Sequence, residues 1–243
     1  MASPLVEYCE QANPGVLLEI RRVGGTTGNA RRVQASFLAD LEKKALIWVA
    51  QRTPSWINSD HLTALGLLGQ LSAGSFYAFS RWNKYYLLAV IVCLALNWLG
   101  DSLDGTLARV RHQQRPRYGF YVDHMVDSFG AVAMMGGLAL SGYMHPGIAI
   151  GLLVAFLVLS IQSYLATYTL EEFRLSFWNI GPTELRLLLA VGNLALLHWP
   201  VVLHGKYRLF DVGGMIGLIG MSLMLVFFTA KHAYRLYREE RIG

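Results

Sequence analysis

Hydrophobic residues dominate long stretches of the chain, and polar residues gather between them. Each stretch comes near or above the ~20 residues that a helix needs to cross ~30 Å of hydrocarbon. Because backbone groups must be satisfied internally in lipid, such stretches are typical of membrane-spanning helices. The pattern predicts an all-α, polytopic membrane protein with six transmembrane helices, at residues 61–80, 85–107, 119–141, 148–169, 185–203 and 209–230.

A different pattern precedes the first stretch. In "SFLADLEKKALIWVA" (residues 36–50), apolar positions recur at helical spacing, with Glu42, Lys43 and Lys44 on the other side. We expect an amphipathic helix that lies in the membrane interface and is ended by Pro54. The predicted organisation is a cytosolic N-terminal segment (1–35), an interfacial helix with its linker (36–56), a six-helix transmembrane domain (57–235) and a cytosolic tail (236–243).

Composition and charge support this interpretation. The chain is 54% hydrophobic and 15% charged, which is unusual for a soluble protein. Most of its 21 Lys and Arg residues fall on the side of the N-terminus, and the other side keeps only Arg81, Lys84, Lys206 and Arg208. The positive-inside rule therefore predicts that both termini face the cytoplasm. The net charge of +5 then indicates attraction to anionic lipid head groups and not to nucleic acid.

Small residues occur within the apolar stretches, as in "GIAIG" (147–151) and "GGMIG" (213–217). Such residues let helix backbones approach closely. The contact can lie within one subunit or between two, so a homodimer stays open.

Four carboxylates interrupt the apolar pattern, in "DSLDGTLARVRHQQRPRYGFYVDHMVD" (101–127). Asp101 and Asp104 are three residues apart, and Asp123 and Asp127 are four apart, so each pair shares one helix face. Asp101 lies ~24 Å along its span when counted at ~1.5 Å per residue, near the cytosolic end. Since the two spans are joined by a short loop, the four carboxylates are expected to converge in one layer open to the cytosol.

An ionised Asp in a membrane must be solvated, paired or bound to a cation. Hard oxygen ligands without companion His or Cys favour Mg²⁺, Mn²⁺ or Ca²⁺ over zinc. His124 follows Asp123 directly and is expected to point off the carboxylate face. The alternative is a salt-bridge network at the helix ends with Arg109, Arg111, Arg115 and Arg117.

The carboxylates belong to a longer pattern. Asp101-x-x-Asp104-Gly105-x-x-Ala108-Arg109, followed by Gly119-x-x-x-Asp123-x-x-x-Asp127, resembles the signature of the CDP-alcohol phosphotransferases, membrane enzymes of phospholipid synthesis. The nine residues between Arg109 and Gly119 are one more than that family usually shows, in a polar loop where an insertion is tolerated. A weaker similarity to the family's Pro-Asn-x-x-Thr stretch has Ser59 and Asp60 in place of Pro and Asn, and keeps Thr63.

The resemblance implies transfer from a CDP-linked donor, CDP-diacylglycerol or a CDP-amino alcohol, to an alcohol acceptor, with release of CMP. It implies two divalent cations, Mg²⁺ or Mn²⁺ with Ca²⁺ as an alternative, held by Asp101, Asp104, Asp123 and Asp127. Asp127 would also be the general base.

The resemblance likewise implies a nucleotide site. It would be formed by Asp60, Thr63, Asp104, Gly105, Ala108, Arg109 and Gly119. Its small residues would leave room for the cytidine diphosphate to approach the helix backbone. Capping of the first span is an equally good role for Asp60.

A further polar group, "GPTELR", begins the fifth span. Glu184 and Arg186 are expected at its cytosolic end, where Arg186 would bind the phosphate of the acceptor or of a lipid. Snorkelling of Arg186 to the interface is the alternative.

Two other functions compete with the enzyme. Intramembrane carboxylates also mark divalent-cation transporters, but that function favours carboxylates near the midplane. An inactive membrane scaffold would not need all four Asp residues. The sequence does not distinguish between alcohol acceptors.

Overall fold

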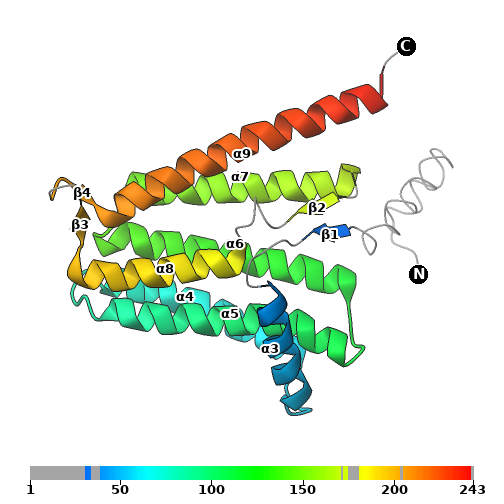
Figure 1. Cartoon of the computed structure of the whole chain (residues 1–243), viewed down its shortest axis with the longest axis horizontal. Coiled ribbons are helices and arrows are strands. Elements are labelled where there is room, and N and C mark those ends of the chain that lie inside the picture. Colours follow the sequence, from blue (N-terminus) through cyan, green and yellow to red (C-terminus); the bar gives the residue numbers. More distant parts are fainter. Residues whose placement is uncertain (1–30, 34–38, 171, 175–180, 203–204, 242–243) are drawn as a thin grey trace, which may run out of the picture.

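The computed structural model describes residues 31–33, 39–170, 172–174, 181–202 and 205–241. Its helices run roughly side by side, and one shorter helix crosses them near one end (Figure 1). The described residues form α3 (Ala39–Arg52), α4 (Ser59–Phe79), α5 (Tyr86–Val110), α6 (Pro116–Ser141), α7 (Pro146–Leu170), α8 (Pro182–His198) and α9 (Leu209–Glu239). The all-α prediction is confirmed for this part of the chain, whereas the predicted segment 1–35 lies almost entirely outside it.

The count of six spans is not confirmed. Within the described ranges, four helices are long and apolar enough to cross a membrane: α4, α5, α7 and α9. α8 has 17 residues, fewer than the ~20 that a full crossing requires. α6 has 26 residues, but Arg117, Asp123 and Asp127 lower the hydropathy of its first half. The six predicted stretches nevertheless each contain one helix.

Two predicted boundaries are wrong. The fifth stretch was expected to run to residue 203, but α8 ends at His198 because Pro200 disfavours helical backbone at Trp199 and offers no N–H itself. α9 continues nine residues beyond residue 230, to Glu239, and so takes in part of the predicted tail.

Two small sheets connect the helices. β1 (Arg31–Val33) pairs in parallel with β2 (Glu172–Arg174), which follows α7. β3 (Val201–Val202) pairs antiparallel with β4 (Tyr207–Arg208) between α8 and α9. The first pairing brings the chain before α3 to the same end of the bundle as the end of α7.

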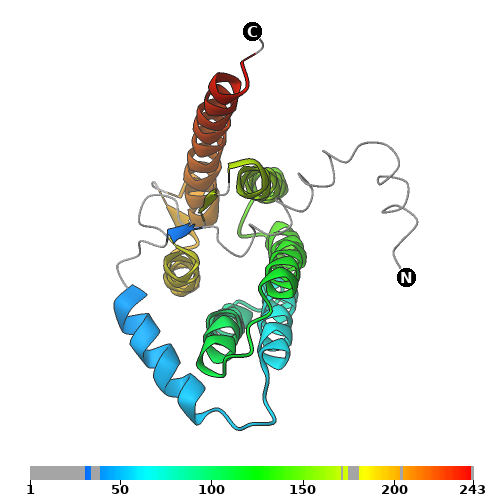
Figure 2. The same cartoon turned by 90° about the vertical axis from the view of Figure 1, so that its right-hand side faces the viewer.

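α3 marks one end of the bundle, which we call the α3 end. Figure 2 shows it crossing beside α5 and α8, and its range matches the predicted amphipathic helix. Leu46 and Ala50 are buried against Leu62 of α4 and against Leu103 and Leu107 of α5. Lys43 and Lys44 are exposed as predicted. The prediction is wrong for Glu42, whose carboxylate faces α5 and α8.

α4, α5 and α6 pack most closely, through glycines. A Cβ on Gly100 of α5 would stand 2.5 Å from the amide nitrogen of Gly66 on α4. A Cβ on Gly69 would stand 2.8 Å from the amide nitrogen of Asn97. The two backbones therefore touch where any side chain would separate them. Asp101, the residue after Gly100, is thereby fixed close to α4.

Candidate active site

The first turn of α4 lies at the α3 end and is capped by Asn58. The His61 N–H donates to the Asn58 side-chain oxygen over 3.1 Å, and the Asn58 N–H donates to the His61 ring over 3.3 Å. This reciprocal arrangement satisfies two amides at the helix start. The alternative prediction that Asp60 caps the helix is wrong, because Asn58 already occupies that position.

The loop between α5 and α6 is tied to the linker between α3 and α4. The Arg111 guanidinium donates to the carbonyl oxygens of Ile57, Thr53 and Pro54 at 2.5, 2.8 and 2.9 Å. An Arg with several donors in a rigid fork suits such a set of carbonyls. The predicted salt-bridge role of Arg111 is wrong, since backbone oxygens take its donors.

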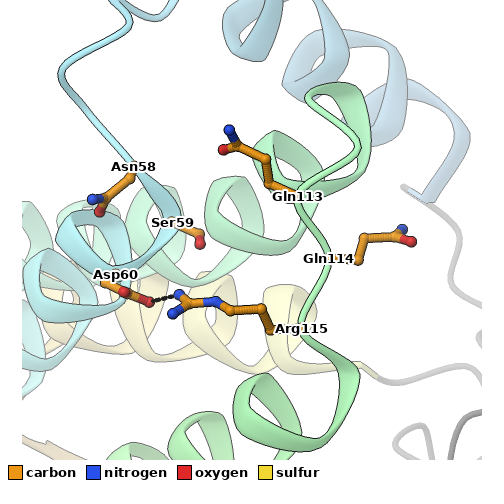
Figure 3. A pocket seen from close by; sticks show the side chains of 6 residues that line it. All are labelled: Asn58, Ser59, Asp60, Gln113, Gln114 and Arg115. Atoms are coloured by element: carbon orange, nitrogen blue, oxygen red, sulfur yellow. Dashed lines mark hydrogen bonds and ion pairs between the residues drawn. The ribbon is translucent and has the colours of Figure 1, made fainter.

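A polar pocket of about 390 Å³ opens between this loop and the start of α4 (Figure 3). The Arg115 guanidinium reaches across it and forms an ion pair with Asp60. The carbonyl and amide groups of its Asn and Gln side chains offer both donors and acceptors. Its lining residues are Asn58, Ser59, Asp60, Gln113, Gln114 and Arg115.

Asp101 is paired with Arg186 of α8. The Arg186 Nη2 lies 2.6 Å from the Asp101 Oδ2, and the Arg186 Nε donates to the Asn97 Oδ1 over 2.7 Å. The Arg186 side chain is 14% exposed and that of Asp101 is 26% exposed. Arg186 therefore points into the bundle, and the snorkelling alternative is wrong. Charge-assisted contacts of this kind hold both side chains in place.

Asp104 is held from α4. The Thr63 hydroxyl donates to the Asp104 Oδ2 over 2.6 Å, and the Gly105 N–H donates to the Oδ1. Thr63 and Asp104 are thus in direct contact, and their binding of a nucleotide stays a prediction. A Cβ on Gly105 would meet only Arg109, at 3.4 Å, and one on Gly119 would meet no described atom within 4 Å. The space beside both glycines is open.

Asp123 and Asp127 come from the facing turns of α6. Asp127 lies close enough to Asp101, Asp104 and Asp123 for their charges to act on it, and the Arg186 charge acts on it as well. The four carboxylates therefore form one electrostatic neighbourhood with one cation of α8 inside it. Charges interact more strongly in the protein interior than in water, because the effective dielectric constant there is lower.

His124 lies beside this neighbourhood but belongs to an aromatic cluster. Its buried ring stacks on Tyr164, with ring centroids 4.8 Å apart, and lies 4.2 Å from the ring of Phe120. Its Nδ1 is 3.4 Å from the Asp123 carboxylate. The prediction that His124 points off the carboxylate face is not confirmed, because its ring nitrogen contacts Asp123.

The donor set fits a hard divalent cation by its chemistry, since it consists of carboxylate oxygens. Among the residues that the structure describes, no three Asp, Glu, His or Cys side chains already converge closely enough to hold a metal ion. Arg186 and Thr63 contact oxygens of Asp101 and Asp104 in this structure.

The remaining predicted residues have local contacts. The Arg109 Nη2 donates to the Thr106 hydroxyl over 3.0 Å, one turn back along α5, and Ala108 is half-buried. The Glu184 Oε2 accepts from the Gly181 N–H over 2.9 Å and so closes the first turn of α8. Phosphate binding by Arg109 and acceptor binding by Glu184 stay predictions.

Sequence reasoning missed Asn97 and Glu42. Asn97 is buried, donates to the Gly66 carbonyl over 3.0 Å and accepts from Arg186, so it links three helices. Glu42 precedes the buried Leu46 and Ala50 by four and eight residues, which places it on their face of α3. That spacing could have revealed Glu42 from the sequence alone.

Comparison with known proteins adds one match. The model of the CDP-alcohol phosphatidyltransferase family matches residues 56–230, which include all four carboxylates, the pocket and α8. No individual curated protein matches the chain significantly. Because the family match spans well over half of the chain, the protein belongs to the CDP-alcohol phosphatidyltransferases, membrane-bound transferases of phospholipid biosynthesis that use a CDP-linked donor and release CMP.

Proposed function

We propose that the protein transfers a phosphatidyl or phospho-alcohol group from its CDP-linked donor to an alcohol hydroxyl at the carboxylate neighbourhood of α5 and α6. The observation that carries this is the placement of the four carboxylates at the α3 end, where Asp101 and Asp104 of α5 are held by Arg186 and Thr63 and lie near Asp127 of α6. Four carboxylates so placed repel one another, and a ligand that brings positive charge relieves the repulsion.

Asp101, Asp104, Asp123 and Asp127 would hold two divalent cations, Mg²⁺ or Mn²⁺ with Ca²⁺ as the alternative. Bound there, such cations would neutralise the diphosphate and orient an in-line displacement. Thr63 supports this role, because its hydrogen bond of 2.6 Å fixes the Asp104 carboxylate from α4.

Asp127 is the proposed general base. The acceptor oxygen forms a bond to the phosphorus farther from cytidine, the bond from that phosphorus to the bridging oxygen breaks, and CMP leaves with the electron pair. The hydroxyl proton passes to the Asp127 carboxylate.

The nucleotide would extend from the open space beside Gly105 and Gly119 toward the polar pocket. Ala108 and Arg109 lie one turn further along α5, where Arg109 would contact phosphate. Donor and acceptor groups of Asn58, Gln113 and Gln114 suit the edge of a nucleobase. Asp60 would take part once Arg115 turns toward the nucleotide.

Arg186 is proposed to bind the phosphate of the acceptor or of the lipid. In the structure it neutralises Asp101. Once the charge of the carboxylates is balanced by other means, its guanidinium is available to a phosphate, which it can bind through two parallel donors. Glu184 would serve this site by ordering the first turn of α8, in which Arg186 lies.

We further propose that the α3 end faces the cytoplasm, with both termini on that side. The charge distribution of the sequence supports this orientation. α3 would then lie in the interface, and the described helices from α4 onward would form the catalytic domain. A homodimer stays open, because the glycines of both motifs face leucines of the same subunit: a Cβ on Gly151 would meet Leu218, and one on Gly217 would meet Leu152.

The test is release of CMP by the purified full-length protein. CDP-diacylglycerol, CDP-choline and CDP-ethanolamine are each offered with a panel of polyol, amino-alcohol and diacylglycerol acceptors, in Mg²⁺, Mn²⁺ or EDTA. We expect metal-dependent CMP release from at least one pair. No release from any pair, combined with Mn²⁺ flux into proteoliposomes, would favour the transporter instead.

A further inference from the structure

Glu42 of α3 gathers hydrogen bonds from two other helices. Its Oε1 accepts from the Trp98 indole N–H over 2.9 Å and from the Ser102 hydroxyl over 3.1 Å, both on α5. The same oxygen accepts from the Thr183 hydroxyl of α8 over 3.1 Å, and Oε2 lies 3.3 Å from that hydroxyl. One carboxylate of a peripheral helix therefore joins α5 to α8.

The three donors lie within three residues of Asp101 or Arg186 along the sequence. Trp98 lies three residues before Asp101, and Ser102 is the next residue after it. Thr183 lies three residues before Arg186, one turn back on α8. Glu42 thus binds α5 and α8 at residues that lie close in sequence to the two members of the ion pair.

Side-chain contacts hold the first turn of α8. It begins at Pro182, and its first amides are held by its own residues, as in the bond from Gly181 to Glu184. The contacts with Arg186 and Thr183 join this end of α8 to α5 and α3. Removing Glu42 leaves the Trp98 indole and two hydroxyls without their acceptor, which favours rearrangement of the helices.

We propose that Glu42 is a positioning residue of the transferase: it fixes the first turn of α8 against α5 and so sets Arg186 beside Asp101. The proposal rests on the role of the carboxylate site put forward above. It gives α3 a function beyond lying at the membrane surface, because the geometry of the site then depends on how α3 is seated. A misplacement of about 1 Å at a reacting centre is enough to slow turnover strongly.

The test compares Glu42→Ala with Glu42→Gln, and uses Lys43→Ala as the matched control on the exposed side of α3. Gln keeps a carbonyl oxygen for the three donors and adds an N–H₂ that can donate to Thr183. We expect Glu42→Ala to lower kcat for CMP release roughly 10- to 100-fold. We expect Glu42→Gln to stay within about threefold of the unaltered protein. The KM for the CDP donor should change little, because the nucleotide pocket lies on α4 and the α5–α6 loop.

A second measurement does not depend on turnover. Spin labels at Lys44→Cys of α3 and Leu188→Cys of α8, in a protein with Cys9 and Cys93 replaced by Ala, report the distance between the helices by pulsed electron paramagnetic resonance. We expect Glu42→Ala to broaden this distance distribution, and Glu42→Gln and Lys43→Ala to leave it narrow. Thr183→Val, which removes one donor, provides a milder variant if Glu42→Ala fails to fold.

The outcomes separate the two proposals. If the unaltered protein releases no CMP from any pair, the proposed function fails, and the distance distribution alone decides whether Glu42 holds α3 to α8. Glu42→Ala or Thr183→Val with unchanged kcat and an unchanged distribution would overturn the positioning role. A fall in kcat that Glu42→Gln shares equally would also overturn it, since the acceptor oxygen is still present in that variant.

Discussion

The α4–α5–α6 half of the molecule and the α7–α9 pair are built differently, although all are apolar helices. In the apolar stretches of α4 and α5, 39% of residues are buried inside the protein, against 17% in α7 and 6% in α9. The first half is held by glycine contacts and buried polar groups, whereas α9 presents apolar side chains such as Ile216, Val226 and Phe227 outward. In lipid such outward residues need no protein partner.

The difference shows where precision is needed. Asp101, Asp104 and Thr63, which donates to Asp104, come from the close-packed half, where no side chain stands between the backbones of Gly66 and Gly100. The side chains that hold Asp101 and Asp104 come from α8 and α4. The proposed catalytic residues therefore lie in the half whose helices pack closely.

The largest expected effect breaks the chemistry of the close-packed half and leaves its packing intact. Asp127→Asn removes the proposed base with almost no change in volume, so kcat for CMP release should fall about 10²- to 10⁴-fold. Binding of the CDP donor, measured by calorimetry, should persist. Phe227→Ala on α9, whose side chain is 62% exposed, should leave kcat unchanged. Normal turnover in Asp127→Asn would remove the base from the mechanism.

The second effect breaks the packing itself. Gly100→Ala places a Cβ 2.5 Å from the Gly66 nitrogen and the Leu62 carbonyl oxygen, so α4 and α5 must separate. We expect a loss of about 1–3 kcal/mol in the free energy of unfolding, measured in one detergent. Gly220→Ala on α9 is the matched control, because its Cβ would meet no described atom within 4 Å. Equal effects of the two substitutions would contradict the difference between the halves.

The sequence predicts the local features of the molecule better than the contacts between its helices. The length of the apolar stretches located the helices α4 to α9, and helical periodicity located α3, because both signals are local in the sequence. That the Asp faces of α5 and α6 meet in one metal site stays a prediction. The glycines of α4 and α5 were missed because an isolated small residue gives no sign of which backbone approaches it. The partners of Arg115 and Arg186 were also missed, because contacts between helices depend on their rotation and not on spacing along the chain.

A smaller effect is expected from a polar contact within the α7–α9 pair. The Gln162 Nε2 and the His232 Nδ1 are 2.8 Å apart and form a polar contact between α7 and α9. Hydrogen bonds between membrane helices contribute about 0.6 kcal/mol on average. Gln162→Leu should therefore lower the unfolding free energy by about that amount and leave kcat unchanged, as measured by detergent denaturation and CMP release. A loss of catalysis in this variant would show that α9 is coupled to the carboxylate site.

The smallest effect on stability is expected at the rim of the close-packed half, where the Arg115–Asp60 ion pair crosses the polar pocket. The two side chains are 50% and 45% exposed, so water and salt screen their attraction. Arg115→Gln should change the unfolding free energy by only about 0–0.5 kcal/mol.

If the pocket receives the nucleotide, however, Arg115→Gln removes a cation from the donor's path and should raise the KM for the CDP donor, with kcat nearly unchanged. Asp60→Asn removes the partner that draws Arg115 across the pocket, and it should lower that KM or leave it as it is. The KM for the CDP donor, measured at low and at physiological salt, decides whether Arg115 binds the donor. If Arg115 serves only as a surface ion pair, both variants should keep the KM of the unaltered protein.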